Sequence, residues 1–162
     1  MIYLILSLIT IPVLIFLSAQ DLKERMIYSL PVLFLSAGFA VHSVIRYKDE
    51  PVLLVFMWIS ALILYALYKI FHVWGDGDSD MWLLFTGIIL CTFRIESALS
   101  FGFIVSTGLA GAQIMALFVG VIEAALKKDR LKGDSQVAVV PGFSLILTAL
   151  LVYGIIREVG SL

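Results

Sequence analysis

Residues 74–82 read Trp74-Gly75-Asp76-Gly77-Asp78-Ser79-Asp80-Met81-Trp82, with three aspartates and two glycines between apolar runs long enough to cross a bilayer. A carboxylate near hydrocarbon is costly, so acids in such a place indicate a functional site. The glycines let the backbone approach the groups on which the aspartates act. Asp78, Ser79 or Asp80 would also cap a helix beginning near Met81, which is the simpler structural explanation. One residue is enough to cap the helix, so the presence of three aspartates favours a functional site.

The composition is that of a membrane protein. Of 162 residues, 62% are apolar and 14% charged, against about 25% charged in soluble domains. A span needs about 20 residues, so we predict an all-α polytopic membrane protein with six transmembrane helices in a single membrane-embedded domain, residues 1–162. The net charge of −1 argues against nucleic-acid binding. The single cysteine, Cys91, lies in an apolar run and is expected to pack in the core.

The fourth predicted span is unusually short. Its apolar run, Met81 to Phe93, has 13 residues and reaches only about 20 Å at 1.5 Å per residue, against a hydrocarbon core of about 30 Å. The helix must therefore include polar residues, either Asp78 and Asp80 before the run or Arg94 and Glu96 after it. The other spans are expected at residues 1–20, 30–45, 52–73, 97–126 and 143–156.

Two further expectations concern the last third of the chain. The fifth span contains small residues that permit close helix packing, namely Gly108, Ala110, Gly111 and Ala112. Its polar residues are assigned to an interhelical hydrogen bond, for Gln113, and to the membrane interface, for Glu123. Residues 137–142 are predicted to form a short extended segment before the last span.

Charge counting predicts the orientation. In a six-span arrangement the first, third and fifth loops share one side and hold seven basic residues, whereas the other side holds four. The positive-inside rule places the richer side in the cytoplasm. Both termini are then outside, and Asp21 and residues 75–80 lie at the cytoplasmic face of the cell (inner) membrane.

Paired carboxylates offer a definite chemistry. Two aspartates held close together share a proton, because both cannot ionise easily at short range. One then acts as a general base on water and the other as a general acid on a carbonyl oxygen, as in aspartic proteolysis. This chemistry requires no cofactor and no metal ion. From its own surroundings alone, Asp21 is better explained as the residue at which the first helix meets water.

The residues also carry a resemblance to a known family. The sequence Gly75-Asp76-Gly77-Asp78 matches the G-x-G-D motif of polytopic aspartyl proteases, and residues 21–27 resemble the D-L-[KR]-x-[RK]-x-[IV] segment of type IV prepilin and preflagellin peptidases. The resemblance includes a proline near the start of the last helix, which is Pro141 in this sequence. The resemblance implies that Asp21 and Asp78 are the catalytic pair, supported by Gly75 and Gly77. It implies cleavage of class III signal peptides, just before the hydrophobic segment of pilin-like or archaellin-like precursors.

The sequence departs from that family at several places. It has Ile27-Tyr28-Ser29 where members often read I-P-N, and Asp80-Met81 where they read K-L. It lacks the cysteine-rich insertion of the larger bacterial relatives, so we predict cleavage without methylation.

The expected partners are a precursor protein and the lipid bilayer. Three further acids, Asp76, Asp80 and Glu24, are expected to attract the basic residues that precede such cleavage sites. The extended segment, with Val139 and Pro141, is expected to bind the peptide by main-chain hydrogen bonds.

Two other functions use the same acidic cluster. A cation-dependent lipid phosphotransferase or a small transporter would employ Asp76, Asp78 and Asp80. The D-G-x-x-A-R continuation of the phosphotransferases is missing, and the transporter requires Gln113 or Glu123 to line a polar path. An EF-hand calcium loop is rejected, because its sixth and twelfth positions are Met81 and Gly87.

Overall fold

The computed structural model describes residues 1–24, 26–71, 76–127 and 138–160, with the backbone alone for residues 76–78 and 127. Helices make up its regular structure within these ranges, which confirms the all-α prediction. They are α1 (Ile2–Glu24), α2 (Ser29–Arg46), α3 (Pro51–Ile70), α4 (Asp76–Thr92), α5 (Ala98–Lys127) and α6 (Val140–Val159). All except α4 are long and apolar enough to cross a membrane.

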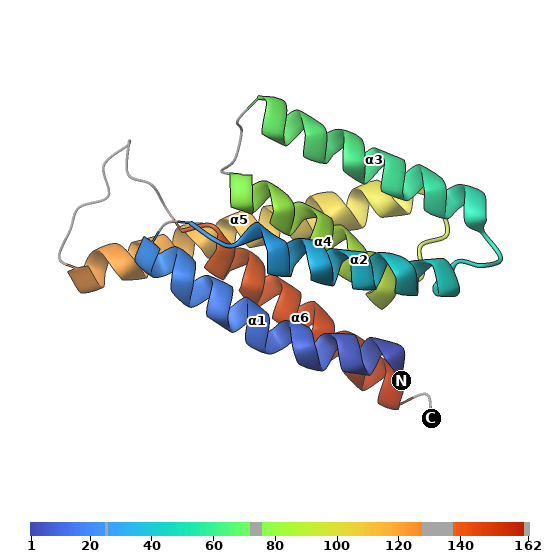
Figure 1. Ribbon diagram of the computed structural model, residues 1–162, viewed down its shortest axis with the longest axis horizontal. Coiled ribbons are helices and arrows are strands. Elements are labelled where there is room, and N and C mark those ends of the chain that lie inside the picture. Colours follow the sequence, from blue (N-terminus) through green and yellow to red (C-terminus); the bar gives the residue numbers. More distant parts are fainter. Residues whose placement is uncertain (25, 72–75, 128–137, 161–162) are drawn as a thin grey trace.

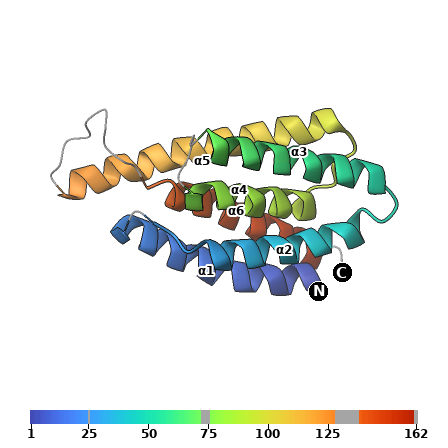
Figure 2. The same cartoon turned by 45° about the horizontal axis from the view of Figure 1, so that its top comes forward.

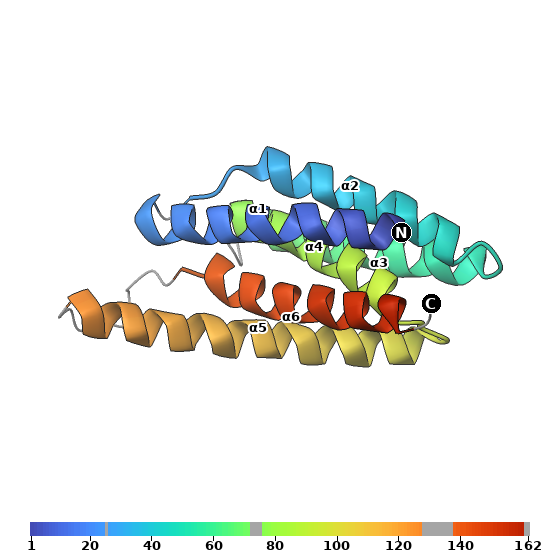
Figure 3. The same cartoon turned by 90° about the horizontal axis from the view of Figure 1, so that it is seen from below.

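The helices run in alternating directions and form three layers of two (Figure 1). Figure 2 shows α3 and α5 in one outer layer, α4 and α6 in the middle, and α1 and α2 in the other outer layer. The start of α1 and the end of α6 lie at one end of the bundle (Figure 3), which we call the arginine end after Arg46 and Arg157. The opposite end holds the end of α1 and the starts of α4 and α6. We call it the aspartate end, after Asp21 and Asp80.

Helix α4 occupies the middle of the bundle. It packs against α2, α3 and α6, and residues 79–92 are all buried. A helix that is apolar all round belongs in an interior, and its 17 residues span only about 25 Å at 1.5 Å per residue. Because α4 begins at Asp76 and ends before Arg94, the short apolar run is extended backwards into the aspartates.

Aromatic residues connect the central helix to α3 in one outer layer and to α6 in its own layer. The Trp82 indole nitrogen donates a hydrogen bond to the Ala61 carbonyl of α3 at 2.9 Å. Phe85 meets Phe143 of α6 edge to face, with ring centroids 5.9 Å apart. Cys91 is buried as expected, and its thiol donates to the Phe39 carbonyl of α2 at 3.3 Å.

Close packing of α5 against α6 depends on small residues, only some of which were anticipated. Ala112 and Ala116 are buried and face Gly142, whose missing side chain lets the two backbones approach. Ala110 and Gln113, in contrast, are exposed. Gln113 makes no hydrogen bond with the described residues, so the predicted interhelical bond is wrong.

The segment before α6 also differs from the prediction. Val137 lies outside the described residues, and Val139 has φ −88° and ψ −35°, which is helical rather than extended geometry. Val140 is already the first residue of α6. Pro141 follows in the first turn, where a proline costs no hydrogen bond because that N–H would be unpaired in any case. The proline favours an early helix start over an extended strand.

Replacing Gly142 with alanine tests the close contact between α5 and α6. An added Cβ would lie 2.4 Å from the Ala116 backbone nitrogen and 2.6 Å from the Ala112 carbonyl oxygen. Backbone atoms cannot move aside cheaply, so we expect Gly142→Ala to lower the free energy of unfolding in mixed micelles by about 1–3 kcal/mol. Gly102→Ala is the matched control, because its Cβ would meet no atom within 4 Å. Equal stability of the two variants would contradict this packing.

Candidate active site

Asp21 is a buried carboxylate in the last turn of α1. Only 6% of its surface is exposed, and its Oδ2 accepts a hydrogen bond from the Val140 backbone N–H at 3.1 Å. The interpretation of Asp21 as a residue in contact with water is therefore wrong. The bond spans 119 positions of sequence and ties the end of α1 to the start of α6.

Helix electrostatics explain why this position holds a carboxylate. A negative charge in the last turn of its own helix is unfavourable, whereas one beside the start of another helix is favourable. The first N–H groups of α6 have no partner within their helix, and the N-cap residue Val139 makes no side-chain capping bond. Asp21 provides this cap from a neighbouring helix.

Asp80 is fully buried near the start of α4, and a cation neutralises it. The Lys69 ammonium nitrogen lies 3.1 Å from its Oδ1, and the Tyr65 hydroxyl donates to the same oxygen at 2.9 Å. Tyr65 and Lys69 are four residues apart on α3, so they share one face of that helix. The other carboxylate oxygen of Asp80, Oδ2, is buried without a hydrogen-bond partner among the described residues.

The remaining members of the aspartate motif are only partly described. Asp76, Gly77 and Asp78 form the first turn of α4, but Gly75 and the side chains of residues 76–78 lie outside the described residues. The distance between the predicted catalytic carboxylates of Asp21 and Asp78 therefore also falls outside the described residues. Both belong to the aspartate end, because α1 ends and α4 begins there (Figure 1). Helices α1 and α4 each pack against α2 and α6.

The residues predicted to bind substrate fall into different surroundings. Glu24 is exposed, with its carboxylate 4.0 Å from the Lys23 ammonium. Val139 is half-buried and Pro141 is buried. Asp80 lacks the exposed surface that contact with basic residues requires, because it is enclosed and paired with Lys69.

An apolar groove of about 940 Å³ runs between α1, α5 and α6. Leu22 and Pro141 line it, and they are the chain neighbours of Asp21 and Val140. One end of the groove thus lies beside the Asp21 carboxylate. Small and hydroxyl side chains, Ser18, Ala19, Ser144 and Thr148, form part of its wall.

Sequence reasoning missed Tyr65 and Lys69. Lys69 lies near the end of the third predicted span, and its four-residue spacing from Tyr65 was the only available signal. Nothing in a linear pattern indicates that this face of α3 meets Asp80 on α4. The pairing emerges only when α3 and α4 pack side by side.

The fold and the site define an all-α polytopic membrane protein with buried carboxylates at one end of its bundle. No family model, no curated protein and no solved structure matches the chain, so the comparisons assign it to no family.

Removing Lys69 tests whether the ion pair neutralises Asp80. Lys69→Met leaves a buried carboxylate without its cation, and we expect the free energy of unfolding to fall by about 3 kcal/mol, the lower end for a broken buried pair because Lys69 itself is one-third exposed. The double variant Lys69→Met/Asp80→Asn should recover most of the loss. Lys23→Met, in an exposed pair, should change stability by less than about 1 kcal/mol. A double variant as unstable as Lys69→Met would contradict the pairing.

Proposed function

We propose that this protein is a membrane aspartyl endopeptidase of the prepilin and preflagellin peptidase type, with Asp21 and Asp78 as its catalytic pair. The observation that carries the proposal is the buried Asp21 carboxylate, held at the same bundle end as the first turn of α4. Burying a carboxylate at a membrane face costs free energy, and an acid that is kept in such a place indicates a functional site. The G-x-G-D motif at residues 75–78 supplies the second carboxylate at that end.

The proposed reaction is hydrolysis by one protonated and one ionised aspartate. The ionised carboxylate takes a proton from water, and the oxygen of that water bonds to the peptide carbonyl carbon. The protonated partner gives its proton to the carbonyl oxygen. Collapse of the tetrahedral intermediate breaks the C–N bond, and the amine leaves with the proton that the first carboxylate took. One hydroxyl of the intermediate returns its proton to the second carboxylate as the carbonyl forms again. The pair returns to sharing one proton.

The surroundings of the two buried aspartates agree with this assignment. Asp80 is fully buried and paired with Lys69, so it has no exposed oxygen with which to reach a peptide bond. Asp21 keeps a small exposed surface and lies beside the apolar groove. Asp21 is the better candidate for the acid–base step.

The proposed substrate is a pilin-like or archaellin-like precursor, cut at the junction of its basic and apolar parts at the cytoplasmic membrane face. Exposed Glu24 provides negative charge for the basic part. The apolar groove beside Asp21 offers a surface for the apolar part. No cofactor enters this mechanism.

A cation-dependent phosphotransferase has less support. It would use Asp76, Asp78 and Asp80 as ligands, yet Lys69 already occupies the Asp80 carboxylate at 3.1 Å. The transporter alternative needs a polar path along α5, and Gln113 is exposed on the outside of the bundle instead.

Asparagine substitutions separate a catalytic Asp21 from a structural one. Asn presents a side-chain oxygen that can still accept the Val140 N–H, so Asp21→Asn should fold normally while its turnover falls by about 10⁴-fold or more, the upper end of what acid–base catalysis contributes. Asp78→Asn should behave alike, and Asp76→Asn should retain most activity. The assay is cleavage of a purified pilin-type precursor, with melting temperature as the folding control. Full activity of Asp21→Asn would restrict that residue to capping α6.

A chelator distinguishes the metal-dependent alternative in the same assay. Hydrolysis by two aspartates should proceed unchanged in EDTA. Activity that EDTA abolishes, and that Asp76→Asn and Asp78→Asn remove equally, would replace the proposal with a cation-dependent reaction.

The proposed orientation is testable by cysteine labelling in whole cells. The native Cys91 is 2% exposed and gives little background. We expect an impermeant maleimide to label Asp49→Cys but to reach Ser135→Cys only after permeabilisation, because the basic loops face the cytoplasm. The reverse pattern would place the aspartate end outside the cell.

A further inference from the structure

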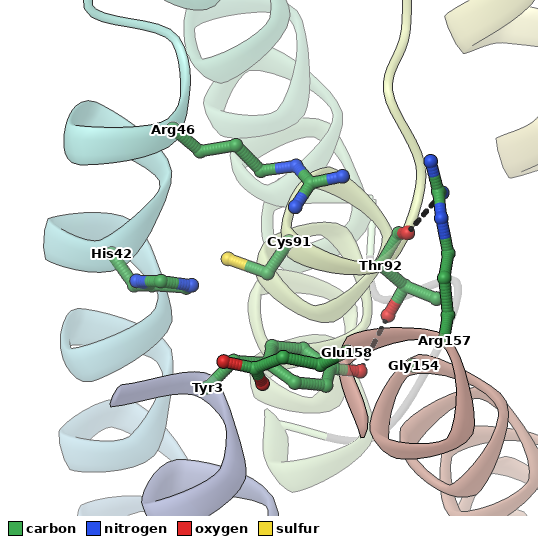
Figure 4. Close-up of a pocket in the computed structure, with 8 residues that line it drawn as sticks. All are labelled: Tyr3, His42, Arg46, Cys91, Thr92, Gly154, Arg157 and Glu158. Atoms are coloured by element: carbon green, nitrogen blue, oxygen red, sulfur yellow. Dashed lines mark hydrogen bonds between the residues drawn. The ribbon is translucent and has the colours of Figure 1, made fainter. Parts of the chain in front are cut away.

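A second polar pocket lies at the arginine end, across the bundle from Asp21 and Asp80. It measures about 350 Å³, within the usual size range of ligand sites. Four helices contribute to its wall, and Figure 4 shows Arg46 and His42 of α2 facing Arg157 of α6 across Cys91 and Thr92 of α4. No step of the proposed hydrolysis uses these residues.

The charges around this pocket do not cancel. Glu158 is paired with the amino-terminal nitrogen of the chain, and Glu50, in an adjoining pocket, is paired with Arg94 at 3.6 Å. Among the described residues, Arg46 has no ion-pair or hydrogen-bond partner. Two guanidinium groups therefore face one pocket, and the acid in the lining of that pocket, Glu158, is already paired. Asp49, in the adjoining pocket, is exposed.

Helix capping explains one of these arginines but not the other. The C-terminal carbonyls of α4 attract cations, and Arg157 donates to the Thr92 carbonyl at 3.2 Å. The next carbonyl, that of Phe93, accepts the Tyr47 hydroxyl at 3.1 Å. Arg46 makes no such capping bond with the described residues.

A histidine nitrogen at the pocket also lacks a hydrogen-bond partner. His42 Nδ1 is buried without a hydrogen-bond partner among the described residues. Leaving a buried polar atom unpaired costs free energy unless a ligand or water completes it. Tyr3 is fixed on the opposite wall, because its hydroxyl bonds to the Thr92 hydroxyl at 2.8 Å.

We propose that this pocket binds a phosphate group between the guanidinium groups of Arg46 and Arg157. A planar guanidinium matches two oxygens of a phosphate, and the tetrahedral anion has further oxygens that accept donors from the opposite wall. The pocket lies where four helix ends meet at one end of a membrane-spanning bundle. The phosphate therefore comes from a lipid headgroup or from a free phosphate in solution.

Calorimetric titration of the purified protein in a maltoside detergent tests the site. The probes are short-chain phosphatidylglycerol, short-chain diacylglycerol, which has no phosphate, and inorganic phosphate. Arg46→Gln and Arg157→Gln should each weaken binding by about ten-fold or more, the effect of losing a charged hydrogen bond. Arg94→Gln is the matched control, since this arginine lies at the same end but is exposed and paired with Glu50. It should bind within about two-fold of the unmodified protein.

The probes identify the source of the phosphate. Phosphatidylglycerol binding more tightly than inorganic phosphate assigns a lipid headgroup, and the opposite order assigns a free phosphate. Equal binding of phosphatidylglycerol and diacylglycerol would overturn the proposal, because it would indicate contact with acyl chains. So would the absence of binding by every probe, or unchanged binding by both glutamine variants.

A competition experiment keeps the proposal testable if the glutamine variants misfold. Sulfate has the same tetrahedral shape and should displace the bound probe from the unmodified protein. Failure of sulfate to compete would overturn the site without any substitution.

Discussion

Helix α4 carries the aspartate motif and cannot face lipid, and this constraint shapes the rest of the bundle. An acidic first turn next to hydrocarbon costs free energy at every exposed carboxylate. The other helices enclose α4 instead, with α2 and α3 on opposite sides and α6 beside it in the middle layer. Burial of residues 79–92 follows from this arrangement. The lipid-facing surface is left to the five longer helices.

Two buried aspartates at the same bundle end are stabilised in different ways. Asp80 receives a cation and a hydroxyl from α3 and has no exposed surface. Asp21 receives a main-chain amide from the start of α6, and it keeps a small exposed surface beside the apolar groove. A group that transfers protons must come within hydrogen-bond reach of the substrate. The difference in exposure is thus a physical reason to assign structural work to Asp80 and chemistry to Asp21.

Sequence patterns predicted those features that depend on local composition. Long apolar runs located the helices, and the short run after Met81 indicated that α4 would extend into polar residues. Features that depend on packing between helices were missed. The pairing of Lys69 with Asp80 requires that two particular helix faces meet. Gln113 was assigned a bond because it is polar, yet the face of α5 that carries it points away from the bundle.

The two ends of the bundle differ electrostatically because the helices alternate in direction. The aspartate end collects the starts of α2, α4 and α6, where partial positive charge favours carboxylates. The arginine end collects the last turns of these helices, where partial negative charge favours cations. Asp21 at the start of α6 and Arg157 at the end of α4 both follow this rule. Arg46 also sits in a last turn, but unlike Arg157 it makes no hydrogen bond or ion pair with the described residues, and its guanidinium is therefore available to a ligand of the pocket.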